Sequence, residues 1–162
     1  MFSQLLFADD SSMEYKIKAG YLYNFTKFIT WSADNSKTFN VCIVGVDPFG
    51  AFIDPIEERS VLERPIKLFR FDSLSSQEKN AHCHILFVSS SIKDTLVGQD
   101  VNNTLVVGES GEFITQSGMI GFVNKQGKIK FQINLKTIKQ NGLIVSAKLL
   151  EVADVVKGDN NE

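Results

Sequence analysis

Residue types that define several specialised protein classes are scarce in this sequence. Cysteine and histidine occur twice each, and proline three times, in 162 residues. Two cysteines cannot build a disulfide-rich scaffold, and no CxxC or HxxxH spacing supports a zinc site. No repeat and no stretch rich in proline, glycine or serine divides the chain. We therefore predict one domain over residues 13–157, followed by a polar tail at 158–162.

An excess of charge and long apolar runs are also absent. The net charge is −2 and the lysines are scattered, so no nucleic-acid partner is expected. No apolar run reaches the roughly 20 residues that a membrane-spanning helix needs, so no direct membrane insertion is expected. Hydrophobic residues make up 43% of the chain, which is the composition of a globular domain with a substantial core.

The first twelve residues have a different character. The short apolar stretch M-F-S-Q-L-L-F-A at 1–8 ends in a small residue and is followed at once by Asp-Asp-Ser-Ser. This pattern favours the end of a secretory signal, although the basic segment and a full apolar segment are missing. The alternative is an ordinary frayed terminus. We predict export, with residues 1–12 forming the residual end of a signal peptide or a disordered tail.

The periodicity of the next segment predicts a helix over residues 13–31. Tyr23 lies in the polar arc of this helix and Asn24 lies in the apolar arc. A buried Asn24 would need hydrogen-bond partners. Tyr23 would either pack under a loop or stand exposed, where an aromatic side chain can anchor an interface.

The middle of the chain shows the alternation of strands and helices that is typical of a parallel sheet. Apolar runs without alternation are typical of strands covered on both faces, and they occur at 39–46, 85–88 and 105–107. A more alternating strand is expected at 66–71. Short helices are expected between the strands, at 49–58, 74–80 and 91–97.

The pattern changes near the C-terminus. Residues 119–123 and 128–133 flank the turn N-K-Q-G and predict an antiparallel hairpin at a sheet edge. Asn134 and Ser146 are placed to cap two further helices, the last with a buried stripe that extends to Val156. The predicted fold class is therefore α/β: a single three-layer domain with a mixed, mostly parallel sheet, an antiparallel hairpin at one edge and helices on both faces.

Two groups of residues suggest chemistry. Asp47 and the serines Ser89, Ser90 and Ser91 follow strands at the edge where ligands usually bind, so a small-molecule pocket is possible there. Asp47 is also placed to cap a helix with Pro48 at its first position. The segment His-Cys-His at 82–84 cannot close a tetrahedral metal site, because alternate side chains of a strand point to opposite faces. With no G-x-S-x-G motif and no cofactor-binding loop, we predict neither an enzyme nor a cofactor.

Segments along the chain, taken together and in this order, resemble the YfiR family. The resemblance covers almost the whole chain beyond residue 13. It is carried by K-A-G-Y-L-Y-N-F-T-K-F-I-T-W at 18–31, V-C-I-V-G-V-D-P-F-G at 41–50, C-H-I-L-F-V-S at 83–89, G-M-I-G-F-V at 118–123, K-I-K-F-Q-I-N at 128–134 and G-L-I-V-S-A-K-L-L at 142–150.

This resemblance implies an exported, periplasmic, non-enzymatic regulator. The best-understood members of the family hold a membrane-anchored diguanylate cyclase inactive, which lowers cyclic di-GMP, and are themselves sequestered by an outer-membrane lipoprotein. Such domains can form homodimers, so the resemblance also implies a homodimer for this chain. Other members accompany sensor kinases or outer-membrane receptors, so the alternative function is a small-molecule-binding module that serves such a protein.

Two further expectations concern particular residues. Cys42 and Cys83 would lie on neighbouring strands within disulfide range, and the alternative is a pair of buried reduced thiols. A second cysteine pair known in the family is absent, so redox regulation through that pair does not carry over. Tyr23, Phe49 and Phe52 are the predicted partner-binding residues, because helix geometry or loop position leaves them off the core.

Overall fold

The structure is a computed structural model that describes residues 2–74, 82–92, 101–110, 112–115 and 118–158, with side chains from Ser12 onward. The helices expected at 74–80 and 91–97 fall almost entirely outside the described residues. Among the described residues, no helix is both long enough and apolar enough to cross a membrane.

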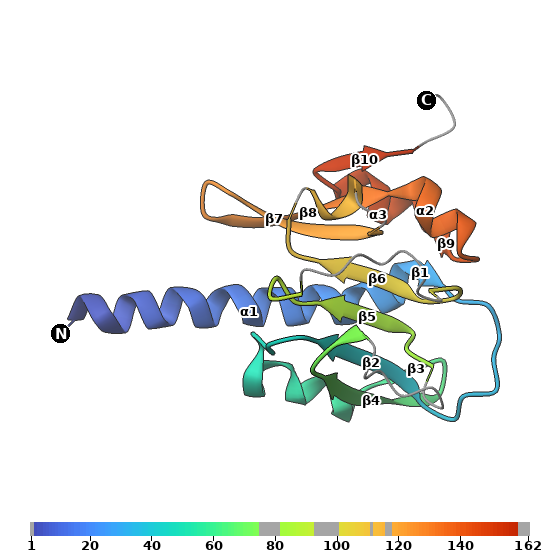
Figure 1. The fold of residues 1–162 in the computed structure, drawn as a ribbon, viewed down its shortest axis with the longest axis horizontal. Helices are drawn as coiled ribbons and strands as arrows, with labels where there is room; N and C mark the ends of the chain where they lie inside the picture. The colour runs from blue at the N-terminus through green and yellow to red at the C-terminus, as the bar shows by residue number, and fades with distance from the viewer. Residues whose placement is uncertain (1, 75–81, 93–100, 111, 116–117, 159–162) are drawn as a thin grey trace.

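An eight-stranded sheet forms the centre of the molecule (Figure 1). Its spatial order is β10-β8-β7-β6-β5-β2-β4-β3, and neighbouring strands run parallel except in the β7–β8 and β3–β4 pairs. The strands are β2 (Phe39–Val44), β3 (Ser60–Val61), β4 (Arg64–Phe71), β5 (Ile85–Val88), β6 (Leu105–Gly108), β7 (Ile120–Lys125), β8 (Lys128–Asn134) and β10 (Val155–Lys157). The predicted mixed, mostly parallel α/β fold is confirmed.

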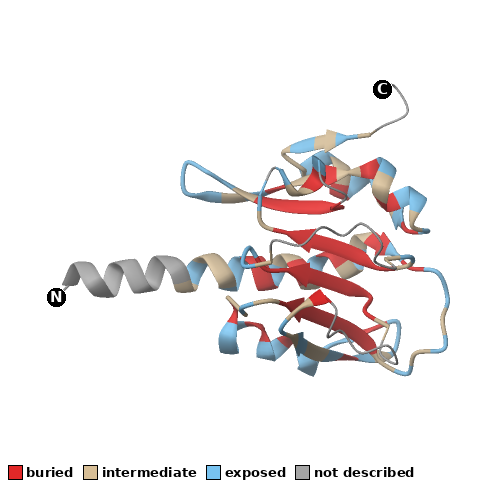
Figure 2. Cartoon of the chain, viewed as in Figure 1, coloured by how far each residue is buried: buried red, intermediate tan, exposed pale blue. Residues whose placement is uncertain are grey.

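Burial on both faces of the sheet explains why the sequences of the central strands do not alternate between apolar and polar residues. Every residue of β2, β5 and β6 is buried, as Figure 2 shows by the red strands. The predicted hairpin is formed by β7 and β8, with Phe122 opposite Phe131. The hairpin lies one strand in from the edge, because the short β10 pairs with the outer side of β8.

Helix α1 (Phe2–Phe28) lies across one face of this sheet (Figure 1). Its inward side chains include Leu22 and Phe25, both fully buried, and the Phe25 ring lies 5.3 Å from that of Phe131 on β8. The helix begins before the predicted residue 13. It ends before the predicted residue 31 because Ile29–Thr30 forms β1, which pairs with β9 (Ile144–Val145). Asn24 is exposed, so the expectation of a buried amide was wrong.

The two predicted helix caps near the C-terminus are present. The Asn134 side chain accepts a hydrogen bond from the Thr137 amide at the start of α2 (Leu135–Gln140). The Ser146 hydroxyl accepts one from the Lys148 amide at the start of α3 (Ala147–Val152). The last helix is shorter than predicted, because the chain leaves it after Val152 to form β10.

Glycine permits one close approach on the sheet. Gly108 of β6 lies opposite Gly121 of β7, and the 3₁₀ segment η3 (Phe113–Thr115) packs against β7 and β8. A Cβ atom at Gly108 would lie 2.4 Å from the Phe113 ring, and one at Gly118 would lie 2.1 Å from it. These positions therefore have no room for a side chain.

Both edges of the sheet are short. At one edge β10 pairs with β8 over three residues, Val155–Lys157. At the other edge β3 pairs with only the first two residues of β4. Beyond β3, the 3₁₀ segment η1 (Gly50–Glu58) and its C-cap lie along β4: the Ile66 amide donates to the Arg59 carbonyl and the Leu68 amide to the Glu57 carboxylate, at 3.0 and 2.9 Å.

Candidate functional site

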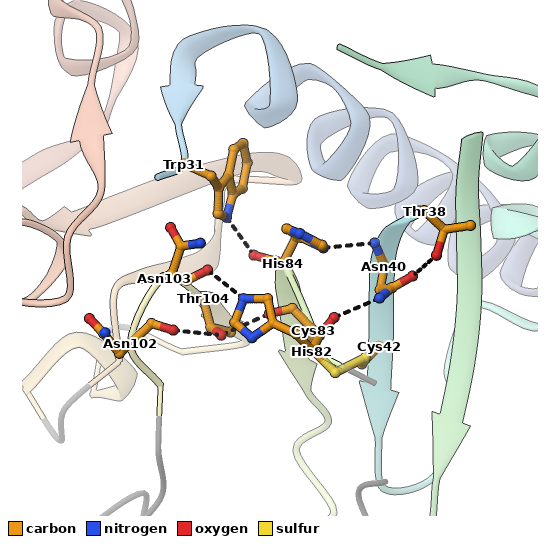
Figure 3. The surroundings of a disulfide bond; sticks show 10 residues. All are labelled: Trp31, Thr38, Asn40, Cys42, His82, Cys83, His84, Asn102, Asn103 and Thr104. Atoms are coloured by element: carbon orange, nitrogen blue, oxygen red, sulfur yellow. Dashed lines mark hydrogen bonds between the residues drawn. A yellow bond between two sulfur atoms is a disulfide. The ribbon is translucent and has the colours of Figure 1, made fainter. Parts of the chain in front are cut away.

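The structure joins Cys42 and Cys83, the pair that the sequence put forward, by a disulfide (Figure 3). Cys42 lies in the middle of β2, Cys83 lies just before the neighbouring β5, and their Cα atoms are 5.9 Å apart. Both residues are buried in the core. The bond therefore fixes the pairing of two central strands, which is a structural role.

A polar cluster around His84 lies beside this disulfide. His84 is fully buried, and its Nδ1 accepts a hydrogen bond from the Asn40 amide at 3.0 Å. Its Nε2 therefore carries the proton and donates to Asp34 at 2.9 Å. Arg64 binds the other oxygen of the Asp34 carboxylate at 3.1 Å. Both ring nitrogens of His84 are thus engaged in hydrogen bonds within the fold.

The surroundings of this cluster shift the pKa values of His84 and Asp34. Burial lowers the pKa of His84 below its ordinary value of 6.5, and the hydrogen bond to Asp34 does not reverse the effect. Burial alone would raise the pKa of Asp34, but hydrogen bonds from Ser36 and His84 outweigh it and hold that pKa well below its usual range. The cluster is therefore built around a neutral imidazole and an ionised carboxylate. Within the described part of the chain, no three His, Cys, Asp or Glu side chains converge as a metal would require.

The loops after β2 and β5 meet, as the sequence predicted, at the carboxyl edge of these strands. The Ser91 hydroxyl accepts a hydrogen bond from the Val46 amide at 2.9 Å. A Cβ atom at Gly45 would lie only 2.6 Å from the Ser91 hydroxyl, so the two loops are in close contact here. Ser89 is buried in this contact, whereas Ser90 is exposed.

Asp47 serves the loop in which it lies. Its carboxylate accepts a hydrogen bond from the Phe49 amide at 2.8 Å and pairs with Arg70 at 2.8 Å. The prediction that Asp47 caps the helix with Pro48 at its first position was wrong: η1 begins at Gly50, its N-cap residue is Phe49, and Asp47 closes a turn before it. These contacts account for Asp47 without a ligand.

A buried ion cluster that sequence reasoning missed lies under α1. The Lys18 ammonium binds Glu109 at 2.7 Å and Glu14 at 2.6 Å, and the Tyr15 hydroxyl donates to the same oxygen of Glu109 at 2.8 Å. Burial and the bond to Glu109 raise the pKa of Tyr15 above its ordinary range. The spacing of Glu14 and Lys18 was visible in the sequence. Glu109, which directly follows β6, reaches the helix only through the fold.

One of the three predicted partner-binding residues lies in the core and not at the surface. Phe49 is 1% exposed, and its ring packs edge-on against Phe87 at 4.8 Å and Tyr15 at 5.4 Å. The expectation that it lies off the core was wrong, because the loop after β2 turns the ring inward before η1 begins. Tyr23 is half-buried and Phe52 is 38% exposed, so both reach the surface.

Tyr23 and Phe52 line one surface hollow, which we term the α1–η1 groove. It has a volume of about 410 Å³ and adjoins a second hollow formed by Tyr23, Pro55, Glu58, Arg59 and Ser60. The α1 residues in it follow the spacing i, i+3, i+4, i+7, which places them on one face of the helix. The groove is lined by Lys16, Ala19, Gly20, Tyr23, Ala51, Phe52, Ile53, Pro55, Ile56 and Arg59.

Cations lie against both aromatic rings of the groove. The Arg59 guanidinium is 4.8 Å from the centroid of the Tyr23 ring, and the Lys27 ammonium is 5.1 Å from it. The Lys16 ammonium is 5.3 Å from the centroid of the Phe52 ring. The ion pairs among the described residues involve none of these three cations. The groove is therefore a surface of aromatic rings and positive charge.

Another hollow lies between α1 and α3. Its volume is about 460 Å³, and its lining is mainly apolar. The residues around it are Tyr21, Asn24, Phe25, Phe28, Phe131, Lys148, Leu149, Glu151 and Val152. The exposed Asn24 therefore lies at the wall of this hollow, together with the charged residues Lys148 and Glu151.

Comparison with known proteins gives one clear result. A family model described as YfiR/HmsC-like matches residues 15–154, which covers nearly all of the domain described above. No curated protein matches the chain.

Proposed function

This chain belongs to the YfiR/HmsC-like family of periplasmic, non-catalytic regulators of the cyclic di-GMP pathway, and we propose that it binds and represses a membrane-anchored diguanylate cyclase. The repressor would contact the part of the cyclase that faces the periplasm. An outer-membrane lipoprotein would relieve the repression by sequestering it.

The α1–η1 groove is the observation that carries this proposal beyond the family match. It presents Tyr23 and Phe52 at the surface, together with cations, and aromatic residues and arginine are enriched at protein interfaces. A binder represses only if it prefers the inactive state of its partner. Moving a cyclase from almost fully active to almost fully inactive would need a preference of about 10⁴-fold.

The test of this function is intracellular cyclic di-GMP in a strain that lacks the gene. We expect cyclic di-GMP to rise above the parental level, and to return when the wild-type chain is supplied on a plasmid. Immunodetection in the parental strain serves as the control that the protein is expressed there, so that its deletion can have an effect. An unchanged level in the deletion strain would rule out cyclase repression as the main role.

The same strain tests the two surface aromatics. Tyr23→Ala and Phe52→Ala chains should fail to restore the parental level, although they accumulate normally. Ile144→Ala is the matched control, because Ile144 is an apolar residue that is 66% exposed and lies on β9, outside the groove. Full restoration by both groove variants would exclude these residues from the interface.

The hollow between α1 and α3 favours a second candidate function, the binding of a small apolar molecule on behalf of a sensor kinase or receptor. Its volume of about 460 Å³ lies in the range of small-molecule sites, and its walls are mainly apolar. A ligand that binds the native state raises the melting temperature by mass action. A compound whose stabilising effect disappears in Phe28→Trp, which narrows the hollow, would support this function.

A further inference from the structure

Gly20 is an unexpected residue at its position in α1. It lies in the interior of the helix, is exposed, and forms part of the wall of the α1–η1 groove. Among the described residues, no atom of another segment would lie within 4 Å of a Cβ atom built on it, and its φ is not positive. Neither packing against the described part of the chain nor backbone conformation therefore requires glycine here.

Glycine in a helix interior has a known cost. It is less favourable than alanine by roughly 0.5–1 kcal/mol, because the unfolded chain loses more freedom at glycine. Gly108 shows the opposite case, since the Phe113 ring fills the space that a side chain would need. A glycine with open space above it is suited to close approach from outside the molecule.

The charges around Gly20 indicate which kind of partner segment the groove would bind. Lys16 and Arg59 line the groove and pair with none of the described carboxylates. The acidic residues of η1 are directed elsewhere: Asp54 binds Arg70, and Glu57 accepts the Leu68 amide. Glu58 lines the adjoining hollow and is not among the residues that line the groove. The groove thus offers positive charge to an incoming chain.

We propose that the α1–η1 groove binds an acidic segment of a partner protein, whose backbone crosses α1 in direct contact with Gly20. The carboxylates of this segment pair with Arg59 and Lys16, and its apolar side chains lie between Tyr23 and Phe52. This inference rests on the proposed function in assuming a protein partner, but it does not depend on that partner being a cyclase.

The test is photo-crosslinking in the native host, with p-benzoylphenylalanine introduced at position 52 of the full chain. The same probe at position 144 gives the background, because Ile144 is exposed on β9 and lies outside the groove. We expect one major adduct from position 52, and mass spectrometry should map it to a partner segment with net negative charge. Gly20→Ala and Arg59→Gln, each combined with the probe, should reduce this adduct at least about tenfold.

A stability measurement separates the proposed contact from a folding effect. Gly20→Ala should raise the melting temperature of the purified chain by about 1–4 °C, while it weakens the adduct. A fall in melting temperature would show that Gly20 has a role within the chain and would overturn the inference. So would an adduct no stronger than that from position 144, an adduct insensitive to Gly20→Ala, or a partner segment without net negative charge.

The proposed cyclase repression and the proposed binding of an acidic segment in the groove can be refuted independently of each other. If the adduct behaves as expected but the partner is not a diguanylate cyclase, the proposed function is wrong and the groove assignment stands. If deletion raises cyclic di-GMP but position 52 gives no specific adduct, the cyclase is repressed through another surface.

Discussion

Replacing Lys18 by methionine should destabilise the protein strongly. The side chains of Lys18 and Glu109 are only 6% and 9% exposed, so both charges of this pair have lost most of their water. Methionine keeps the length of the side chain but removes the ammonium. Glu109 would then retain the Tyr15 hydroxyl as its neighbour, and no other cation of the described residues pairs with it.

The expected magnitude follows from this uncompensated charge. Breaking a buried ion pair on one side typically costs about 3–5 kcal/mol. Adding Glu109→Gln should recover roughly half of that loss or more, because the double variant buries two neutral groups instead of a single charge. Lys16→Met, which removes an exposed lysine of the same helix, should change the free energy of unfolding by less than about 0.5 kcal/mol.

Urea denaturation of the oxidised proteins measures these free energies by linear extrapolation. The comparison of single and double variants forms a cycle that isolates the interaction between Lys18 and Glu109. A loss below about 1 kcal/mol in Lys18→Met would refute the reasoning. A double variant no more stable than Lys18→Met would refute it too.

Three further predictions concern stability. Replacing both Cys42 and Cys83 by alanine should lower the free energy of unfolding by about 4 kcal/mol, since the bond spans 41 residues, and a loss under about 1 kcal/mol in urea would contradict this. The low pKa of His84 means that the unfolded chain binds the proton more readily, so stability should be complete above pH 6.5 and decline as the pH falls below it. The difference between the melting temperatures at about pH 7.5 and about pH 5 should therefore be smaller in His84→Gln than in the wild type. An equal difference in the two proteins would contradict a lowered pKa of His84. Gly108→Ala should destabilise by about 1–3 kcal/mol through collision with the Phe113 ring, and an unchanged melting temperature would show that the ring moves freely aside.

The sheet was predictable because its signals are local. The non-alternating runs around Cys42 and Val106 are what burial on both faces requires, and the structure buries every residue of β2 and β6. The caps at Asn134 and Ser146 were equally visible, since each needs only a short polar side chain before a helix. The short β10 gave no such signal, because three residues are too few to show a period.

The features that the sequence did not reveal depend on contacts between distant segments. Lys18 appears on a helical wheel as an ordinary polar residue, and only the fold brings Glu109 to it across 91 positions. The direction of Phe49 depends on the turn after β2, which the composition of the loop does not determine. Tyr23 and Phe52 could be nominated separately, but the groove between them exists only because η1 packs against α1.

The short edges of the sheet also limit the ways in which this protein can meet a partner. A strand arriving at the β10 edge would find three paired residues, and one arriving at β3 would find two. Along the rest of β4, the Leu68 amide is already bound by Glu57. Recognition by strand addition, in which a partner extends the sheet through backbone hydrogen bonds, therefore has little exposed backbone to use. Selectivity would then depend on side chains of the helical surface, where single substitutions can retune it without disturbing the sheet.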